Sequence, residues 1–244
     1  LKNKQPDTNA ATAKFNVFNL QTPDSHCPLC NHKIRAWENI PVISYVFLLR
    51  GKCSSCKAKI SIRYPTVETA TAILSALVAA SFGATWLTLA VLVLVWCLIG
   101  LTLIDCDHQL LPDDITLPML WLGLAVNAVD LGMQVSITDA VIGAIAGYLV
   151  LWSFYWLFKL LTGKEGMGYG DFKLLAALGA WMGWQSLLPI VILSSLVGAI
   201  VGLGMILIMG RDKSVPMPFG PYLAGAGYLM LIWGPQINDF YFST

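Results

Sequence analysis

The chain has 244 residues, of which 57% are hydrophobic and only 12% are charged. Soluble domains carry about 25% charged residues, so this composition excludes an ordinary soluble protein and indicates an all-α polytopic membrane protein. The formal net charge of +1 gives no indication of nucleic-acid binding.

The positive charges gather near the N-terminus, where ten of the fifteen Lys and Arg residues lie between Lys2 and Arg63. We therefore divide the chain into a soluble, basic head, residues 1–63, and a helical membrane body, residues 64–244. The first 25 residues of the head are polar and lack the apolar core of a signal peptide.

The head contains two Cys-x-x-Cys pairs, Cys27 with Cys30 and Cys53 with Cys56. Two such pairs, separated by 22 residues, have the spacing of a structural zinc site in which each pair gives two thiolates to a tetrahedral ion. A head of this size has little core, so a metal would supply much of its stability. The alternatives are two disulfides or redox-active pairs, which a reducing cytoplasm disfavours.

His26 and His32 flank the first pair and are possible replacement ligands, although four cysteines already complete a tetrahedral shell. Cys97 and Cys106 lie in and just below an apolar run, where packing is the more ordinary role of a cysteine. The sequence therefore predicts four thiolate ligands, which are Cys27, Cys30, Cys53 and Cys56.

The body contains about seven apolar runs, each near the length that crosses a hydrocarbon core of about 30 Å. The predicted spans are residues 64–82, 86–104, 115–129, 137–161, 172–187, 188–209 and 220–233. The runs at 115–129 and 172–187 are short, which allows them to tilt, pair or enter the membrane only in part.

The positive-inside rule orients these spans with the basic head in the cytoplasm. The predicted cytoplasmic loops are residues 105–114, 162–171 and 211–219. The predicted outer segments are residues 83–85, 130–136, 186–189 and the tail 235–244. Every Lys and Arg then lies on the cytoplasmic side or at a helix end on that side. This topology places Asp105 and Asp171 at the same membrane face.

Asp105 is one of four carboxylates after the second apolar run, and it abuts that run directly. A charged side chain costs about 2.5–3.5 kcal/mol at the bilayer centre and marks a functional site by default. Asp107 lies further into the loop, and Asp113 and Asp114 stand where acidic residues favour the first turn of the next helix. Asp105 is therefore the catalytic candidate, and His108 is interpreted as a polar loop residue.

Asp171 is the second candidate, because it stands between a glycine-rich segment and the apolar run at 172–187. The glycines that precede it are Gly163, Gly166, Gly168 and Gly170. A glycine backbone can lie close to an extended substrate, so Gly168 and Gly170 are predicted to form a substrate-approach loop. The alternative interpretation is that Asp171 caps the helix that begins there.

Two carboxylates that meet near a membrane face can share one proton. One ionised Asp would take a proton from water, while the other, protonated, would polarise a scissile carbonyl group. The pair titrates jointly, so the sequence does not assign the acid and the base to individual residues. The chemistry that this pair predicts is hydrolysis of a peptide bond at a membrane.

Several motifs follow one another in a specific order between His26 and Trp233. They are Cys27-Pro-Leu-Cys, Trp37-Glu-Asn-Ile-Pro, Gly51-Lys-Cys-Ser-Ser-Cys, Arg63-Tyr-Pro, Ile104-Asp-Cys-Asp-His-Gln-Leu-Leu-Pro-Asp and Gly168-Tyr-Gly-Asp-Phe-Lys-Leu-Leu-Ala-Ala-Leu-Gly-Ala. In these motifs the chain resembles the type IV prepilin peptidases, the leader peptidase/N-methyltransferases of pilus and type II secretion systems.

The resemblance implies an aspartyl protease of the GxGD type in the bacterial inner membrane, with Asp105 and Asp171 as its catalytic pair. Its substrates would be prepilins and pseudopilins, cut on the cytoplasmic side after a glycine that most often precedes phenylalanine. Family members usually also methylate the new N-terminal amine with S-adenosylmethionine as the donor. The implied partners are these substrates and membrane lipid, with no nucleic acid.

One departure from the family pattern concerns the start of the chain. The family begins with a further membrane helix that carries a Gly-Ser-Phe-Leu-Asn-like motif, and this chain starts after that helix. We therefore expect an eighth span in the full-length protein, and we leave the residues that bind the methyl donor unassigned.

Two other classes of protein fit parts of the pattern. A zinc-dependent membrane protease needs a motif such as His-Glu-x-x-His on a helix, and the three histidines, at positions 26, 32 and 108, form none. A non-enzymatic transporter or assembly scaffold with a zinc head would more usually hold its membrane Asp near the midplane. The two aspartates here are expected at one face.

Overall fold

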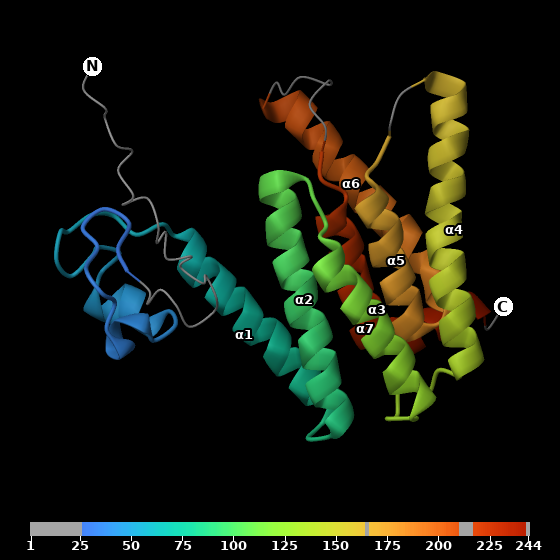
Figure 1. The fold of residues 1–244 in the computed structure, drawn as a ribbon, viewed down its shortest axis with the longest axis horizontal. Coiled ribbons are helices and arrows are strands. Elements are labelled where there is room, and N and C mark those ends of the chain that lie inside the picture. Colours follow the sequence, from blue (N-terminus) through green and yellow to red (C-terminus); the bar gives the residue numbers. More distant parts are fainter. Residues whose placement is uncertain (1–25, 164–165, 210–216, 243–244) are drawn as a thin grey trace, which may run out of the picture. The chain divides into compact units, whose positions relative to one another are not determined.

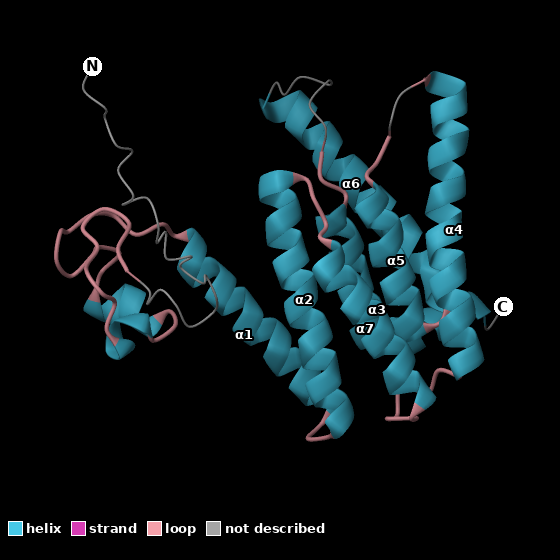
Figure 2. Cartoon of the chain, in the orientation of Figure 1, coloured by secondary structure: helices cyan, strands magenta, loops and turns pink. Residues whose placement is uncertain are grey.

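The computed structural model describes residues 26–163, 166–209 and 217–242, and the structural statements below concern these residues. The polar segment expected at residues 1–25 lies outside them. The chain divides into one unit, Leu1–Ala70, and a second unit, Thr71–Thr244. Figure 2 shows that the described secondary structure is helical, which confirms the all-α expectation.

The first unit is built from short elements and tight turns. It contains a 3-10 helix, η1 (Ala36–Asn39), and a single π turn, η2 (Ser44–Leu48). Two isolated β-bridges join His26 to Lys33 and Lys52 to Lys59. The N–H of Val42 donates to Oε2 of Glu68 over 2.8 Å, which ties the η1–η2 segment to the first long helix.

Seven α-helices are present among the described residues, and they are labelled in Figure 1. They are α1 (Arg63–Phe82), α2 (Trp86–His108), α3 (Asp113–Ala128), α4 (Ile137–Thr162), α5 (Tyr169–Met182), α6 (Leu187–Met209) and α7 (Gly220–Phe242). A 3-10 turn, η3 (Trp184–Ser186), precedes α6. Each helix overlaps one of the apolar runs of the sequence.

Local side chains and glycines set several helix ends. Thr85 caps α2 through a hydrogen bond from the N–H of Thr88 to its hydroxyl, and Ser136 caps α4 in the same way. Gly163 and Gly183 follow α4 and α5 with φ of 70° and 76°. Only glycine adopts this backbone region freely, so these two positions stop their helices.

Four expected boundaries were wrong, and one of them is the end of the run at 172–187, because α5 ends at Met182. Helix α2 continues to His108, so Asp105 lies within the helix and not at its end. Helix α5 already begins at Tyr169, so Gly170 lies in the helix and not in the loop before it, while Gly168 is extended. Helix α7 continues past Pro235, where a loop was expected. Proline removes a backbone donor and is normally unfavourable inside a helix, yet α7 continues through Pro235 to Phe242.

Four described helices are long and apolar enough to cross a membrane: Arg63–Phe82, Trp86–His108, Ile137–Thr162 and Trp184–Ile208. Helices α3 and α5 have 16 and 14 residues and fall short of that length. Many large apolar side chains are exposed on the long helices, among them Trp86, Trp96 and Ile208. Such side chains suit contact with lipid chains, so the second unit is that of a multi-pass membrane protein.

Helix α5 is the most enclosed element of the second unit, since it packs against α3, α4 and α7. Every side chain from Leu174 to Met182 is buried. Helix α4 approaches it closely along Gly143 and Gly147: a methyl carbon at Gly147 would lie 2.7 Å from the carbonyl oxygen of Leu175. Small residues four positions apart allow such contact between membrane helices, and they hold α5 in place.

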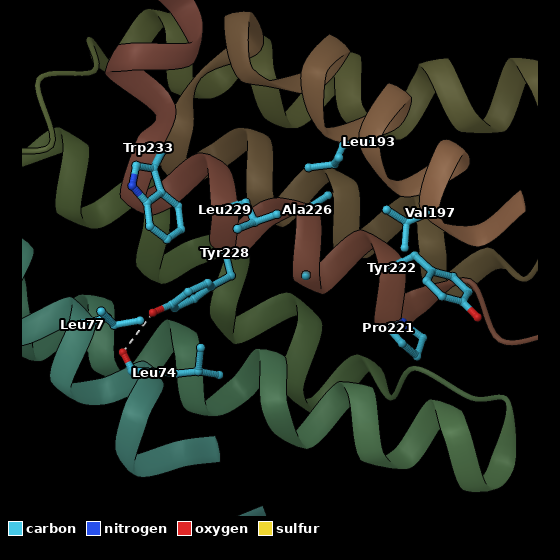
Figure 3. A pocket seen from close by; sticks show the side chains of 11 residues that line it. Leu74, Leu77, Leu193, Val197, Pro221, Tyr222, Ala226, Tyr228, Leu229 and Trp233 are labelled. Carbon is cyan, nitrogen blue, oxygen red and sulfur yellow. Dashed lines mark hydrogen bonds between the residues drawn. The ribbon is translucent and has the colours of Figure 1, made fainter. Parts of the chain in front are cut away.

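An apolar groove of about 440 Å³ lies between α1, α6 and α7. Figure 3 shows its lining, which includes Leu74, Leu193 and Trp233. The hydroxyl of Tyr228 on α7 donates to the carbonyl oxygen of Leu74 on α1 over 3.0 Å. The lining contains no charged side chain, so the groove is not a place for acid–base chemistry.

Candidate active site and metal centre

Asp105 lies near the C-terminal end of α2 and is 5% exposed. Its Oδ2 accepts a hydrogen bond of 2.9 Å from the N–H of Gly220, the first residue of α7. Helix α2 ends at His108, because the next residue, Gln109, adopts a left-handed conformation. The N–H of Gln109 donates to the backbone carbonyl oxygen of Asp105. The carboxylate is thus held between the end of one helix and the start of another.

Asp171 occupies the first turn of α5 and is 6% exposed. Its Oδ2 accepts the N–H of Gly168 over 3.2 Å, as the third residue of a helix does in a capping box. The expected alternatives for Asp171, a cap or a functional group, are therefore not exclusive. Oδ2 caps the first turn of α5, and the same carboxyl group is buried.

The structure brings these two acids together. Their charges are close enough to interact directly, although they come from different helices. Leu111 joins their surroundings, because it contacts both Gly170, next to Asp171, and Gly220, which binds Asp105. The site therefore combines the end of α2, the following turn, and the starts of α5 and α7.

The other acids of the segment after α2 do not enter this site. Asp107 is exposed, as are Asp113 and Asp114. The expectation that Asp113 and Asp114 lie in the first turn of a helix is confirmed, because α3 begins at Asp113. Both oxygens of Asp113 accept from Nζ of Lys173 over 2.6 Å, which joins the first residue of α3 to the fifth residue of α5. Among these four acids only Asp105 is buried.

The predicted substrate-approach loop has a different local structure. Gly168 has an extended backbone and stands immediately before α5, whereas Gly170 already lies in the helix. A methyl carbon at Gly170 would lie 2.6 Å from Cβ of Leu111. Glycine is thus required at position 170 because Leu111 occupies the space of a side chain. The φ of Gly170 is not positive, so the backbone conformation does not itself require glycine.

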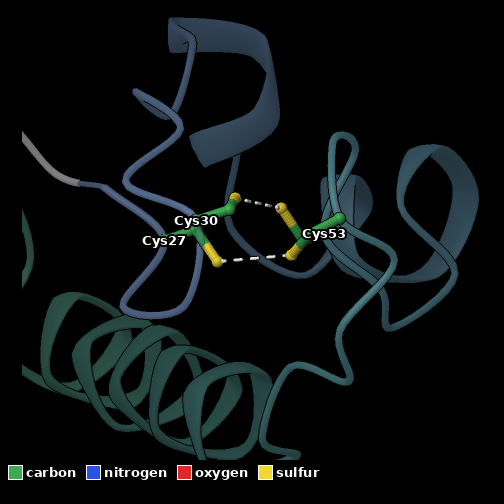
Figure 4. A group of neighbouring side chains, drawn as sticks. Cys27, Cys30 and Cys53 are labelled. Carbon is green, nitrogen blue, oxygen red and sulfur yellow. Dashed lines mark hydrogen bonds between the residues drawn. The ribbon is translucent and has the colours of Figure 1, made fainter.

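The four cysteines of the head form one cluster, with all four sulfur atoms within 4.8 Å of one another. Sγ of Cys27 lies 3.8 Å from that of Cys56, and Sγ of Cys30 lies 3.9 Å from that of Cys53 (Figure 4). A tetrahedral ion with Zn–S distances of about 2.3 Å places its sulfurs about 3.8 Å apart. The cluster therefore has the dimensions of a four-thiolate metal site.

Two matching hairpins build this cluster. In the first hairpin, the N–H of Cys27 donates to the carbonyl oxygen of His32, and the N–H of Asn31 donates to that of Cys27. In the second hairpin, the N–H of Cys53 donates to the carbonyl oxygen of Ala58, and the N–H of Lys57 donates to that of Cys53. Asn31 and Lys57 occupy equivalent positions with φ of 53° and 59°. The first cysteine of each hairpin is buried and the second is exposed. Each hairpin thus presents two sulfurs in the same geometry.

The thiols of the cluster influence one another's ionisation. The backbone N–H groups of Leu29 and Cys30 lower the pKa of the Cys27 thiol to about 7. The N–H of Ala58 lowers the pKa of Cys56, but hydrogen bonds with neighbouring thiols and burial outweigh it and raise that pKa to about 11. Four thiols at this spacing do not all ionise by themselves, and a metal ion removes that conflict because a coordinating thiol is deprotonated.

The remaining cysteines and histidines stand outside this group, which consists of the four cysteines alone among the described residues. Nε2 of His32 lies 3.7 Å from Oε2 of Glu38. Cys97 lies within α2 and is partly buried, and Cys106 is exposed near the end of that helix. The four sulfurs are thus the donors that the head offers.

Comparison with known proteins identifies the family. Residues 92–203 match the profile of the type IV leader peptidase family, and residues 8–82 match that of the bacterial peptidase A24 N-terminal domain. The chain is 60% identical over 227 residues to a prepilin leader peptidase/N-methyltransferase of Aeromonas salmonicida, covering 93% of this chain and 77% of that protein. The chain belongs to the type IV leader peptidase family.

Two further relatives support membership of the type IV leader peptidase family. A prepilin leader peptidase/N-methyltransferase of Pseudomonas aeruginosa is 57% identical over 97% of this chain and 79% of its own length. The protein of the same name from Neisseria gonorrhoeae is 52% identical over 88% of this chain and 72% of its own length. No solved structure matches the chain. Membership of this family argues against a zinc-dependent protease and against a non-enzymatic transporter or scaffold.

Two residues of this leader peptidase site were not singled out from the sequence. Gly220 was expected only as the start of an apolar run, yet its N–H binds Asp105 across 115 positions of the chain. Leu111 was one apolar residue of a loop, and it is buried against Gly170 and Gly220. A glycine at the start of an apolar run and a leucine in an acidic loop carry no local signal of such contacts.

Proposed function

We propose that this chain is a prepilin leader peptidase and N-methyltransferase whose peptidase reaction uses Asp105 and Asp171. The observation that carries the proposal is the meeting of two buried, interacting carboxylates at the ends of two helices. The names of the relatives supply prepilins as the substrate class, and we propose the pseudopilins of type II secretion as further substrates. Gly168 is proposed to lie beside the bound substrate.

The peptidase mechanism follows from two acids with one shared proton. The ionised carboxylate takes a proton from water, whose oxygen attacks the scissile carbonyl carbon, while the protonated carboxyl group donates its proton to the carbonyl oxygen. The gem-diol then collapses: the C–N bond breaks, the leaving amine takes the proton that the first carboxylate removed from water, and a gem-diol hydroxyl returns a proton to the second, now ionised, carboxylate, which restores the pair. Two carboxylates this close do not both ionise readily, so one pair supplies both roles, and it acts as a pair.

The proposed topology places cleavage at the cytoplasmic face of the bacterial inner membrane. It has seven spans in this chain, with the head, residues 1–63, in the cytoplasm and the catalytic body, residues 64–244, in the membrane. The distribution of Lys and Arg supports it. A basic leader then stays in the cytoplasm, and the apolar segment that follows the cleavage point enters the membrane.

The proposed metal is zinc, held by Cys27, Cys30, Cys53 and Cys56. Sulfur spacing near 3.8 Å and four soft thiolate donors support it. With four protein ligands the ion has no position left for a catalytic water, so its role would be structural. For the methyl donor we propose S-adenosylmethionine, in keeping with the relatives' name, and we assign no residues to it.

The decisive experiment measures cleavage of a purified prepilin by the chain in detergent, with mass spectrometry of both products. We expect Asp105→Asn and Asp171→Asn each to abolish cleavage, because losing either acid removes a proton acceptor or a donor. Asp107→Asn and Asp114→Asn are the matched controls, exposed acids of the same segment, and should keep substantial activity. Normal cleavage by Asp105→Asn, or loss with Asp107→Asn alone, would refute the assignment.

A further inference from the structure

The start of α7 contributes directly to the environment of Asp105. Gly220 is buried at the first position of the helix, and its N–H donates to Oδ2 of Asp105 over 2.9 Å. The first N–H groups of a helix have no partner within it. Pro221 follows and has no N–H, while the N–H groups of Tyr222 and Leu223 both donate to Phe219. Gly220 is therefore the donor that α7 directs at the acid.

The contact requires a residue without a side chain at this position. A methyl carbon at Gly220 would lie 2.7 Å from Oδ2 and 3.2 Å from Cγ of Asp105, and 3.2 Å from Cδ2 of Leu111. The φ of Gly220 is not positive, so the backbone conformation alone does not demand glycine. Glycine is required because the carboxylate of Asp105 occupies the space that a side chain would need.

The two acids are held in corresponding ways. Oδ2 of Asp171 accepts the N–H of Gly168 at the start of α5, and Oδ2 of Asp105 accepts the N–H of Gly220 at the start of α7. A helix N-terminus favours a negative charge beside it. Asp171 receives this contact from its own helix, whereas Asp105, near the end of α2, depends on a different helix for it.

We propose that Gly220 is a positioning residue of the peptidase site: its N–H holds Oδ2 of Asp105 and leaves Oδ1 for the reaction with substrate and Asp171. The inference rests on the proposed peptidase function. It makes α7 part of the active site, although α7 lies beyond the residues that match the leader peptidase family profile. Displacing the carboxylate should slow the chemical step, since an error of about 1 Å at a reacting group can cost about 100-fold in rate.

The kinetic test compares Gly220→Ala with Gly225→Ala on the same helix. A methyl carbon at Gly225 meets nothing within 4 Å, so this variant controls for a helical Gly-to-Ala change. We expect Gly220→Ala to lower kcat about 100-fold with KM nearly unchanged, and Gly225→Ala to cleave normally. A Gly220→Ala enzyme with normal kcat, or one whose loss lies in KM alone, would overturn the proposal.

A spectroscopic test needs no activity and covers the case in which Gly220→Ala fails to fold. The sequence contains two Phe-Gly pairs, Phe82-Gly83 and Phe219-Gly220, so protein labelled with 13C-carbonyl phenylalanine and 15N-glycine gives two selected amide signals. Gly83 lies before the start of α2, at the opposite end from Asp105. We expect Asp105→Asn to shift the Gly220 signal and to leave that of Gly83 in place.

The two tests separate this inference from the function on which it rests. If Asp105→Asn is inactive but does not move the Gly220 signal, the peptidase assignment stands and the role of Gly220 is refuted. If Asp105→Asn cleaves prepilin normally while the Gly220 signal shifts, the contact exists but the peptidase assignment fails, and the proposed positioning role falls with it.

Discussion

Glycines of the second unit differ in what their missing side chains make possible. Gly163 and Gly183 end helices through positive φ. Gly170 and Gly220 have ordinary backbone conformations, and each lies against Leu111. At these two positions glycine allows close packing around the carboxylates, so the effect of a substitution depends on the neighbour and not on the backbone.

Gly170→Ala should therefore damage the site from within. The new methyl carbon would meet Cβ of Leu111 at 2.6 Å, and forced overpacking typically costs about 1–3 kcal/mol. We expect a lower thermal midpoint in detergent and slower prepilin cleavage, because the helix start that carries Asp171 must shift. Gly204→Ala on α6, where a methyl carbon meets nothing within 4 Å, is the control. Wild-type stability and cleavage in Gly170→Ala would show that the contact with Leu111 is not restrictive.

The sequence could indicate two kinds of site residue: those whose burial is costly in free energy and those that recur at a regular spacing. An Asp beside an apolar run stands out because burial of a carboxylate is expensive, and paired cysteines stand out by their spacing. Gly220 and Leu111 act through contacts with residues far along the chain. Such contacts depend on helix packing, which no local pattern encodes.

At the scale of elements, the apolar runs predicted where the helices lie, but they missed the ends of α2, α5 and α7 by several residues. The extra turn of α2 consists of Asp105, Cys106, Asp107 and His108. These polar residues suggest a loop, yet the helix continues because Gln109 provides a left-handed stop only after them. This extra turn places Asp105 within the helix, where its carboxylate meets Gly220 of α7.

The head is the second element that allows a sharp prediction. The purified chain should carry about one zinc ion, and Cys27→Ser combined with Cys30→Ser should remove it, because two of four ligands are lost. Structural zinc contributes about 10–16 kcal/mol of apparent binding free energy in small peptides, so the head should then become sensitive to protease. Elemental analysis and limited proteolysis measure both effects.

The matched control for the head replaces the two cysteines that lie outside the cluster, Cys97→Ala with Cys106→Ser. This variant should keep its zinc and a protease-resistant head. Zinc that persists after loss of Cys27 and Cys30, or that disappears with Cys97 and Cys106, would contradict the four-thiolate site.

At the scale of the whole molecule, the proposed chemistry depends on membrane topology. Asp105 lies near the end of α2 and Asp171 near the start of α5. With α3 and α4 between them as a pair that leaves and returns, both acids belong to one face. The short α3 and α5 do not reach the length of a full span, and the close packing of α5 against α3, α4 and α7 compensates by enclosing it in protein.

Single cysteines placed in the connections test this topology, in a background without Cys97 and Cys106. Exposed positions are available on both expected faces: His108→Cys and Thr162→Cys on the cytoplasmic side, Ala84→Cys and Leu131→Cys on the other. An impermeant thiol reagent applied to intact spheroplasts should label positions 84 and 131 only. In inverted vesicles, where the exposed head cysteines also react, the peptides that carry positions 108 and 162 should be labelled and those that carry 84 and 131 should not. Labelling of 108 and 162 from opposite sides would separate the two aspartates across the membrane, and a reaction that shares one proton between them would then be impossible.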